Sequence, residues 1–427
     1  MSYLKHLSSN ISAMSFYMLL LLKFILSLKD RQVMNDKQNK IVITSAVRTA
    51  IGSFKGSLKD MHAHELGSIV IKEAIKKSNL KPSDIDEVIM GQVLTAATGQ
   101  NPARQAAIKA GVPIEKTSYV INQVCGSGLR SVAAAYQSLV SRDASIILAG
   151  GQESMSNAPH AINFQKGKKL EEKNLIDTML HDGLWDAFNG YHMGNTAENV
   201  ATKWKISRKD QDDFALSSQI KTEKAQKDGK FENEIVPIIL KSKDKNNEFY
   251  LDEHPRAKMT IERLTKLRSA FIKDGTVTPG NSSGLNDGAA AVILMNESEA
   301  KKRNLSPLVK IASWATCGVD PSLMGSGPIP SAKKALEKAG WKVSDLDLIE
   351  SNEAFAAQSL AVIKDLEIPK EKVNVNGGAI ALGHPIGASG TRILVTLIHE
   401  MMKRNAKKGL ASLCIGGGMG IAMCIER

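Results

Sequence analysis

The feature that most constrains the fold of this chain is a sequence pattern that occurs twice. Three segments of the first half recur in the second half in the same order: residues 74–89 at 335–349, residues 126–130 at 388–392, and residues 148–151 at 415–418. Asp84 matches Asp345 at an offset of 345 − 84 = 261 residues, and Gly126 matches Ala388 at an offset of 388 − 126 = 262. Similar offsets in a shared order predict an internal duplication.

The first unit has the pattern of an α/β fold, in which short apolar runs rich in β-branched residues alternate with helical patterns. The expected strands are 41–46, 84–93, 118–124 and 145–150, and the expected helices are 64–78, 102–110 and 126–140. Strands interleaved with helices in this way imply crossover connections and a buried sheet. Between the two units, residues 152–273 are rich in charge and contain a helical pattern at 207–227. A segment of this length and mixed composition fits an insertion that covers a ligand better than a flexible linker.

Length and composition fit a cytoplasmic type of enzyme better than a secreted one. The 427 residues suffice for two or three domains or for one duplicated fold, and 43% of them are apolar. Four cysteines are too few for a disulfide framework in so long a chain. They form neither a CxxC pair nor a cluster with histidine at zinc spacing, so we expect a reducing compartment and no metal site.

The formal net charge of +12 has three explanations: a polyanionic partner, a small ligand rich in phosphate, or a solvated surface rich in lysine. The lysines are spread along the chain rather than gathered with aromatic residues in one stripe. This distribution argues against a nucleic-acid partner.

The first 33 residues differ in texture from the rest of the chain. Residues 11–28 are largely apolar, but they include Lys23 and are marginal in length for a membrane span. The segment lacks the arginine-rich pattern of a transit peptide, and Met34 opens a polar run before the first strong strand. We expect residues 1–33 to be an extension outside the fold, best explained by a start codon assigned too far upstream. A membrane anchor or a targeting signal to an organelle matrix is the alternative.

Two cysteines and one histidine, each within a different glycine-rich segment, are the candidate reactive groups. They are Cys125, His384 and Cys414. Glycine lets the backbone approach a ligand closely and adopt dihedral angles closed to other residues. Two thiols and an imidazole on such turns suggest a nucleophile, its activator and a second proton carrier, and hence acyl transfer through a cysteine thioester.

The setting of each group supports this interpretation. Cys125 falls between an apolar strand and a helix that opens at Gly126, where the helix dipole is expected to favour the thiolate. On position alone, a buried structural cysteine is the favoured interpretation, because free cysteine is commonly buried. His384 lies on a turn rigid enough to hold a base, and Cys414 precedes three glycines that could bind an anion. Cys317 and Cys424 are assigned to structure.

Asn352 and Glu353 follow the end of a predicted strand in the second unit. This polar pair could orient water or side chains in the site. Asparagine is also favoured as the N-cap of a helix, and the two interpretations carry equal weight.

Six motifs together resemble the thiolase family, most closely its biosynthetic type, the acetyl-CoA C-acetyltransferases. They are residues 45–52, 122–128, 281–290, 352–355, 377–390 and 414–420. The resemblance runs from about Ile41 to the C-terminus, and six motifs in family order make it very specific. Pro279 is a mild departure, because small residues are also common there in the family.

The resemblance implies a duplicated core with two similar five-stranded halves in αβαβα layers and an inserted loop domain that covers coenzyme A. We expect one core half from residues 34–151 and 274–306, the loop domain from 152–273, and the other half from 307–427. The implied activity is the reversible Claisen condensation of two acetyl-CoA to acetoacetyl-CoA and CoA through an acyl-cysteine. Coenzyme A is then substrate and product, no cofactor is needed, and a cytoplasmic homotetramer, a dimer of dimers, is expected.

The resemblance also implies roles for single residues. Cys125 would accept the acyl group, His384 would activate it, and Cys414 would take a proton from acetyl-CoA or return one to the leaving thiol. Asn352 would hold a water that, with His384, stabilises the enolate, and the N–H groups of Cys125 and Gly416 would form a second oxyanion site. The implied coenzyme A residues are Leu184, His192, Met193, Arg256, Phe271, Ser283, Ala354 and Phe355.

Several competing functions are weighed against this expectation. A longer-chain 3-ketoacyl-CoA thiolase usually differs around Cys125 and at His192-Met193. Decarboxylating condensing enzymes of the same fold place two histidines, or a histidine and an asparagine, around the cysteine, whereas this chain has a second thiol. A non-catalytic acyl-CoA-binding protein need not keep Cys125, His384 and Cys414. A scaffold tethered to a membrane by the N-terminal apolar run would leave the glycine-rich motifs unexplained.

Overall fold

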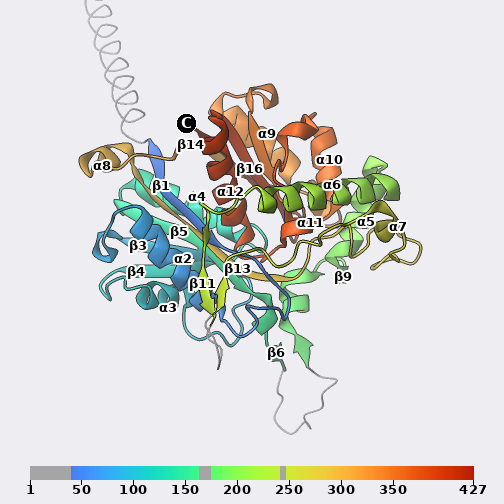
Figure 1. Cartoon of the computed structure of the whole chain (residues 1–427), viewed down its shortest axis with the longest axis horizontal. Coiled ribbons are helices and arrows are strands. Elements are labelled where there is room, and N and C mark those ends of the chain that lie inside the picture. Colours follow the sequence, from blue (N-terminus) through green and yellow to red (C-terminus); the bar gives the residue numbers. More distant parts are fainter. Residues whose placement is uncertain (1–39, 163–174, 241–246) are drawn as a thin grey trace, which may run out of the picture.

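The structure is a computed structural model that describes residues 40–162, 175–240 and 247–427 (Figure 1). The expectations for residues 1–33 therefore lie outside the described residues. Within the described ranges, no helix combines the length and apolar character required to cross a membrane.

One central sheet contains two halves with the same strand order. The first half is β4 (Thr117–Ile121), β3 (Glu87–Gly91), β5 (Ile146–Ser154), β13 (Asn286–Asn296) and β1 (Ile41–Thr49). The second half is β15 (Leu348–Ser351), β16 (Lys408–Ile415), β17 (Met419–Glu426) and β14 (Val309–Gly318). The halves meet where β1 and β14 pair antiparallel. The place of β4 in the second half is taken by a single parallel bridge between Ile349 and Val373. The expected duplication is therefore confirmed, with the fifth strand of the second half reduced to this bridge.

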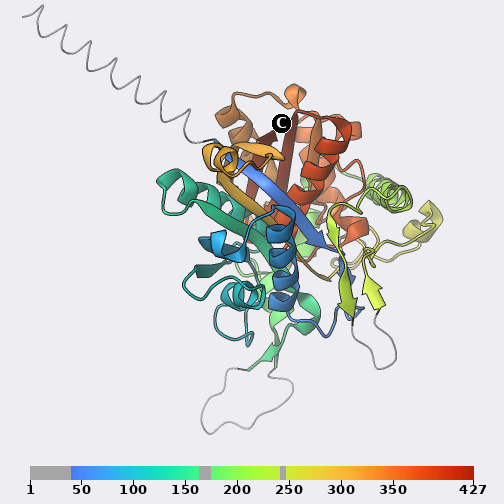
Figure 2. The same cartoon turned by 60° about the vertical axis from the view of Figure 1, so that its left-hand side comes forward.

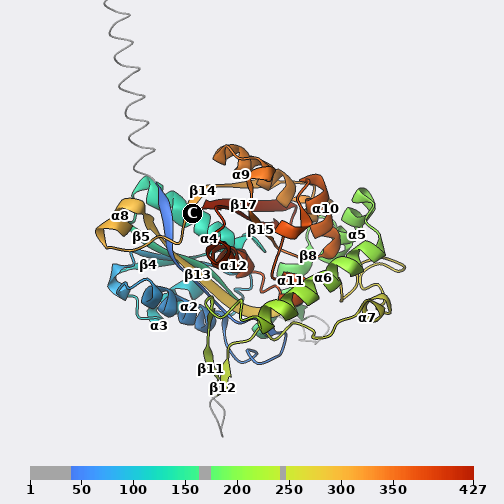
Figure 3. The same ribbon diagram turned by 45° about the horizontal axis from the view of Figure 1, so that its top comes forward.

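Helices cover both faces of each half and lie between the halves (Figure 3). The middle layer is α4 (Ser127–Ser141) and α12 (Ser389–Arg404). The outer helices are α2 (Ala63–Lys77) and α3 (Pro102–Lys109) on the first half, and α9 (Pro328–Ala339) and α10 (Ala356–Asp365) on the second. Three separate clusters of buried apolar side chains fill the spaces between these layers. The αβαβα layering expected from the resemblance is confirmed.

The strands between the layers are apolar on both faces because helices cover both faces. The residues of β13 from Ala290 to Met295 are all buried, and they alternate between two clusters. Ala291, Ile293 and Met295 belong to the outer cluster of the first half, and Ala290, Val292 and Leu294 belong to the cluster between the halves. Successive side chains of a strand point to opposite faces. A continuous apolar run therefore fills two cores at once.

The two middle helices cross at a pair of equivalent glycines. A Cβ on Gly390 would lie 2.3 Å from the backbone nitrogen of Leu129, and a Cβ on Gly128 would lie 2.8 Å from the backbone nitrogen of Thr391. Thr391 Oγ1 donates a hydrogen bond to the carbonyl oxygen of Gly128 at 2.7 Å. Gly128 and Gly390 occupy the same place in the repeat, so the duplicated motif brings the N-terminal ends of α4 and α12 together.

The helices of the segment between β5 and β13 lie beside the second half, whereas its strand β10 (Ile235–Val236) and its hairpin of β11 (Ile238–Leu240) and β12 (Asn247–Phe249) pack against the first half (Figures 1 and 2). These helices are α5 (Met193–Trp204), α6 (Arg208–Lys227) and α7 (Ile261–Thr265), and the other strands of the segment are β6 (His160–Ala161), β7 (Ile176–Asp177), β8 (Trp185–Asp186) and β9 (Tyr191–His192). Helices α5 and α6 contact α10. The remaining elements are β2 (Gly52–Ser53), α8 (Glu297–Lys302) and α11 (Ala379–Leu382).

Several boundaries differ from the expected ones. Strand β5 continues to Ser154, where it pairs with Asp287, and β10 of the inserted segment pairs with β1. The expected strand 84–93 starts only at Glu87, because residues 82–84 form a 3₁₀ turn with Pro82 at its first position. The expected strand 118–124 ends at Ile121, before a turn that carries Cys125. The division into domains at the stated residues stays a prediction.

Candidate active site

A cavity of about 700 Å³ lies between the inserted segment and the turns of the two halves that carry Cys125, His384 and Cys414. Its lining includes Cys125, His384 and Cys414, which come from three distant parts of the chain. It also includes all the residues expected to contact coenzyme A: Leu184, His192, Met193, Arg256, Phe271, Ser283, Ala354 and Phe355. Asn352 and Gly416 are not among the lining residues. Asn352 contacts His384, and the N–H of Gly416 donates to the Cys125 sulfur.

Cys125 is carried by a strained turn between β4 and α4. Val124 has φ of 44°, a left-handed conformation that is a genuine outlier for a β-branched residue. The turn is held by two hydrogen bonds, in which the Val124 N–H donates to Asn122 Oδ1 at 2.9 Å and the Gln123 N–H donates to Ser127 Oγ at 2.8 Å. Strain of this kind persists only where the surroundings impose it, and it turns the Cys125 side chain toward the cavity.

The expectation that the helix favours a Cys125 thiolate at rest is wrong. Burial raises the pKa of the Cys125 thiol to about 11, even though the N–H groups of Gly416 and of Cys125 itself donate to the sulfur. The carboxyl of Glu153 also raises the pKa. Desolvation of the charged form therefore outweighs the donors and the helix terminus, and the resting group is a neutral thiol.

His384 is a neutral base with a defined free nitrogen. Ser389 Oγ lies 2.5 Å from His384 Nδ1 and 2.9 Å from the carbonyl oxygen of Pro385. Since the hydroxyl donates its one proton to that carbonyl, it accepts from Nδ1–H, which leaves the lone pair on Nε2. Burial, and next the guanidinium of Arg392, lower the pKa of His384 to about 3. The backbone N–H of His384 donates to Asn286 Oδ1 at 2.8 Å and fixes the turn.

Asn352 extends β15 toward the imidazole and does not cap a helix. Its backbone N–H donates to the carbonyl oxygen of Ser412 at 2.9 Å, and its Nδ2 lies 3.4 Å from each ring nitrogen of His384. Helix α10 starts later, with Phe355 as its N-cap and no side-chain cap. Of the two interpretations left open by the sequence, the N-cap is excluded.

Cys414 lies near the end of β16 and is 1% exposed. Burial, and next the neighbouring Cys125 sulfur, raise the pKa of the Cys414 thiol far above its ordinary value. The following turn has Gly417 and Gly418 at φ of 83° and 80°, a region that favours glycine. This tight turn directs the N–H of Gly416 at the Cys125 sulfur.

Aromatic side chains form one wall of the cavity. The rings of His192 and Phe271 stack with centroids 4.6 Å apart, and Phe355 meets Phe271 edge-on at 6.3 Å. A Cβ on Gly194 would lie 2.2 Å from the Phe271 ring, so glycine is required for this packing. Arg256 is exposed at the cavity mouth, where its backbone N–H donates to Gln219 Oε1. An apolar wall next to an exposed cation suits a long ligand with a charged end.

Three positions that touch the reactive groups carried no expected role: Ser389, Asn286 and Glu153. Ser389 is the counterpart of Ser127 in the repeat, and both hydroxyls support a turn at a helix start, so the repeat held a signal for it. The Glu153 carboxylate accepts from the N–H groups of Val93, Leu94 and Gly387. No local sequence signal marks that carboxylate, because all three donors are distant in the chain.

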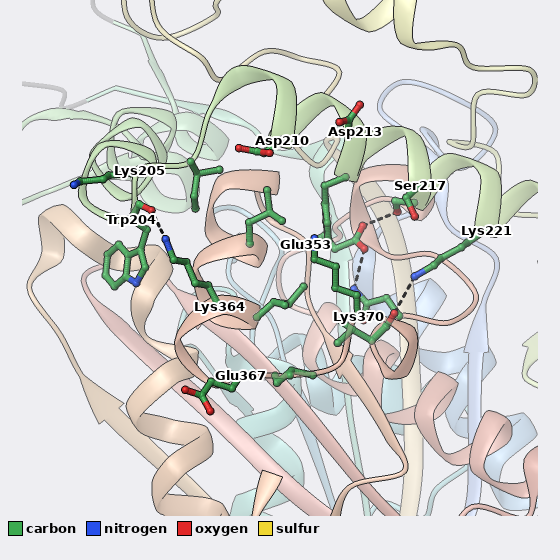
Figure 4. A pocket seen from close by; sticks show the side chains of 18 residues that line it. Trp204, Lys205, Asp210, Asp213, Ser217, Lys221, Glu353, Lys364, Glu367 and Lys370 are labelled. Atoms are coloured by element: carbon green, nitrogen blue, oxygen red, sulfur yellow. Dashed lines mark hydrogen bonds between the residues drawn. The ribbon is translucent and has the colours of Figure 1, made fainter. Parts of the chain in front are cut away.

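A second cavity of about 560 Å³ includes in its lining Glu353, the residue that follows Asn352 in the chain (Figure 4). It is lined by residues of α6 and α10 and by the side chain of Glu353. Glu353 accepts hydrogen bonds from Ser218 Oγ at 2.7 Å, Asn374 Nδ2 at 2.8 Å and the Ile380 N–H at 3.2 Å. Glu353 therefore anchors the segment from behind.

Comparisons with known proteins agree with this geometry. The model of the thiolase N-terminal domain matches residues 41–298, and that of the thiolase C-terminal domain matches residues 305–427. Acetyl-CoA acetyltransferase of Paracoccus denitrificans is 61% identical over 388 residues, which cover 91% of this chain and 99% of the relative. The cytosolic acetyl-CoA acetyltransferase of Mus musculus is 52% identical over 396 residues, which cover 92% and 100%.

Two solved structures are also similar. The acetyl-CoA acetyltransferase of Bacillus anthracis superposes with a TM-score of 0.89 at 45% identity and covers 91% of this chain and 99% of that one. Human mitochondrial 3-ketoacyl-CoA thiolase in complex with CoA superposes with a TM-score of 0.86 at 41% identity and covers 91% and 98%. Both family models, which together span almost all of the chain from Ile41 onward, and relatives of this identity establish that the chain belongs to the thiolase family.

Proposed function

We propose that the protein is an acyltransferase that condenses two acetyl-CoA to acetoacetyl-CoA and CoA, and catalyses the reverse thiolysis. One observation carries the proposal: Cys125, His384 and Cys414 line the same cavity. The relatives named acetyl-CoA acetyltransferase support the same reaction. The complex of the human relative with CoA supports coenzyme A as the ligand of this cavity.

The first half-reaction transfers an acetyl group to Cys125. The thiol proton moves to Nε2 of His384 as sulfur attacks the thioester carbonyl, because a separated thiolate and imidazolium are both disfavoured in the buried site. The N–H groups of Cys125 and Gly416 lie beside the Cys125 sulfur, which bonds to the thioester carbonyl carbon. They can therefore donate to the oxyanion that forms on this carbon. The C–S bond to coenzyme A breaks, and Cys414 protonates the leaving thiolate.

The second half-reaction forms the carbon–carbon bond. The Cys414 thiolate left by the first step removes a proton from the methyl group of a second acetyl-CoA. The enolate oxygen is stabilised by donors from the side of Asn352 and His384, either directly or through a water. The enolate carbon then attacks the acetyl-Cys125 carbonyl, and the released Cys125 sulfur recovers its proton from His384. Protons and electron pairs balance over the two steps.

A short-chain substrate is proposed in preference to a long-chain one. Cys414 packs in an apolar cluster with Met193, Met324, Ala354 and Phe355. An acyl chain extended beyond the reacting sulfur atoms would have to displace these packed side chains. Thiolysis of 3-ketoacyl-CoA substrates of increasing length tests this: kcat/KM is expected to fall steeply beyond the shortest members, whereas a flat profile would favour the longer-chain alternative.

The activity itself is tested with two cysteine variants. The wild-type protein is expected to cleave acetoacetyl-CoA with free CoA, followed by ultraviolet absorbance, and to gain one acetyl group at Cys125 when incubated with acetyl-CoA. Cys125→Ser is expected to lose the acetyl adduct and the thiolysis together, because the nucleophile is gone. Cys414→Ser is expected to form the adduct more slowly, because the leaving thiolate lacks its acid, and to lose at least 100-fold in condensation, because the base for the acetyl-CoA methyl group is gone.

Cys424→Ser is the matched control, because Cys424 is a buried cysteine of β17 that does not line the cavity. Its activity is expected to stay within a factor of two to three of wild type. Absence of any acetyl adduct on wild-type Cys125 would contradict the proposed function. Full condensation activity of Cys414→Ser would contradict the role of that thiol.

We also propose how the chain assembles and where it is located. Strand β4 is at the edge of the central sheet, and its Tyr119 side chain is 37% exposed. An unpaired edge with exposed aromatic surface suits pairing with a second copy of the chain. We expect a homotetramer by light scattering, disrupted by Tyr119→Lys, and a cytoplasmic location in cells.

A further inference from the structure

The guanidinium of Arg392 is buried next to Asn352, the residue whose amide contacts His384. Arg392 is in the first turn of α12 and is 2% exposed. Its counterpart in the repeat, Arg130, lies half-buried over the ring of Trp314, with its guanidinium carbon 5.1 Å from the centroid. The same motif residue thus contacts an aromatic ring in one half, and in the other half Asn352, which lies beside His384.

Arg392 contacts two side chains of the same sheet edge. Its Nη2 donates to Asn352 Oδ1 at 3.5 Å, and its Nη1 lies 3.7 Å from Glu350 Oε2. Glu350 and Asn352 are two residues apart on an extended segment, so their side chains point to the same face. Within the described ranges, Nε and Nη1 of Arg392 have no hydrogen-bond acceptor. A buried guanidinium with unused donors is costly, which argues that it has a task other than stability.

The backbone around Asn352 is held without Arg392. Asn374 clamps Ser351 through two hydrogen bonds, from the Ser351 N–H to Oδ1 at 2.9 Å and from Nδ2 to the Ser351 carbonyl oxygen at 2.8 Å. The Asn352 N–H is bonded to Ser412, and Glu353 is anchored in the second cavity (Figure 4). Arg392 therefore decides the orientation of the Asn352 amide, not the position of its backbone.

The orientation of that amide matters for the charge that develops in the reaction. With Oδ1 toward the guanidinium, the Nδ2 donor faces the His384 ring at 3.4 Å. A flipped amide would place its N–H groups against a cation and would present an oxygen lone pair to the site. An oxygen acceptor beside an enolate oxygen is repulsive, whereas an N–H donor is attractive.

The local charges leave the guanidinium only partly neutralised. Burial raises the pKa of Glu350 to about 8, although Arg392 opposes the shift. The 3.7 Å between Arg392 Nη1 and Glu350 Oε2 also leaves the guanidinium without a hydrogen bond to this carboxyl. Glu234 and Asp252 also act on Arg392, but both bind Arg48 through hydrogen bonds of 2.6 to 3.0 Å. Positive potential behind Asn352 favours an anion on its cavity side.

We propose that Arg392 is a positioning residue for enolate formation, holding the Asn352 amide with its donor toward the site and adding positive potential behind it. The inference rests on the proposed function. Its main effect is on the second half-reaction, where the enolate forms. The oxyanion donors for acetylation of Cys125 are the N–H groups of Cys125 and Gly416, so Arg392 influences that step only through its charge on His384. The two half-reactions are therefore affected differently.

The test compares Arg392→Met and Arg392→Lys with Arg130→Met, the equivalent position of the repeat. Three quantities are measured: acetylation of Cys125 by mass spectrometry, exchange of the acetyl-CoA methyl protons with deuterated water, and kcat and KM of condensation. Arg392→Met is expected to slow proton exchange and kcat of condensation on the order of 100-fold. Acetylation and KM are expected to stay within about threefold, and Arg392→Lys, which keeps the charge, to recover part of the loss.

Several outcomes would overturn the inference. Equal losses in acetylation and proton exchange would show a general structural defect, and unchanged exchange would show no role. If Arg392→Met does not fold, the double variant Arg392→Met with Glu350→Gln removes the carboxyl that would otherwise be left unpaired, and the Lys variant still tests the charge. A wild-type protein without acetylation would refute the proposed function itself, a result distinct from failure of the Arg392 variants alone.

Discussion

At the scale of single residues, the reactive groups are defined by burial more than by their neighbours in sequence. Cys125 and His384 are both neutral at physiological pH because the cavity penalises each charged form. Nucleophile and base are thus stored as an uncharged pair that separates charge only when a thioester is present. The Ser389 hydroxyl holds the imidazole in the tautomer that this requires.

This neutral pair predicts the pH dependence of the first half-reaction. A thiol with a pKa of about 11 loses its proton only at a pH well above the physiological range. An imidazole with a pKa of about 3 gains a proton only at a pH well below that range. The rate of Cys125 acetylation is therefore expected to show no titration step from either group between pH 5 and about 9. Rapid quench followed by mass spectrometry of the acetylated peptide measures this rate.

A control separates a third group from the pair. Burial raises the pKa of Glu153 to about 7, and its charge acts on Cys125. A step near pH 7 that disappears in Glu153→Gln belongs to that carboxyl. Steps near the ordinary values of imidazole and thiol, at about 6.5 and 8.5, which persist in Glu153→Gln would contradict the neutral pair.

At the scale of elements, the site depends on the crossing of two equivalent helices. α4 begins two residues after Cys125, and α12 begins five residues after His384. Their contact at Gly128 and Gly390 brings both turns to one place, although the turns are more than 250 residues apart in the chain. Close approach of backbones at paired small residues is what makes this possible.

Gly390→Ala tests the crossing. Its Cβ would lie 2.3 Å from the Leu129 nitrogen, so the helices must move apart. We expect a loss of about 1–3 kcal/mol in the free energy of unfolding, measured by denaturant titration, together with a large loss of thiolysis. Gly318→Ala is the control, since its Cβ would approach no atom closer than 3.9 Å. Equal stability of the two variants would show that the crossing tolerates separation.

At the scale of the whole molecule, the inserted segment is fastened to the second half behind the active site. Ser218 of α6 donates to Glu353 at 2.7 Å and accepts from the Gly378 N–H at 3.0 Å. One side chain of the insertion thereby touches both the Asn352 segment and the turn that leads to His384. The cover over the cavity and the catalytic segments are one connected structure.

Ser218→Ala is expected to weaken this connection. It removes a donor from the buried Glu353 carboxylate and an acceptor from Gly378, at a cost of about 1–3 kcal/mol in unfolding free energy. The KM for CoA is expected to rise as well, because the insertion carries most of the cavity wall. The exposed neighbour Ser217 is the control, and Ser217→Ala is expected to match wild type in thermal unfolding and KM. A loss shared by both variants would contradict the proposed fastening.

Much of this arrangement could be predicted from the sequence because it follows from local patterns. The doubled strand and helix periodicity determined two similar halves, and the glycine-rich turns marked Cys125, His384 and Cys414. Those features depend on residues near one another in the chain, whose spacing alone sets which faces are apolar and where the backbone must turn.

Only the tertiary structure decided the state of the reactive groups. The Cys125 thiol is neutral because of its burial, and the His384 tautomer depends on the Ser389 hydroxyl. The Asn352 amide meets the guanidinium of Arg392 from a distant part of the chain. Desolvation and hydrogen bonding act through space among segments that the layered fold brings together, so no local pattern carries them. The expectation of a Cys125 thiolate was wrong for this reason. The sequence showed that Cys125 precedes a helix, but it did not show how deeply the thiol is buried.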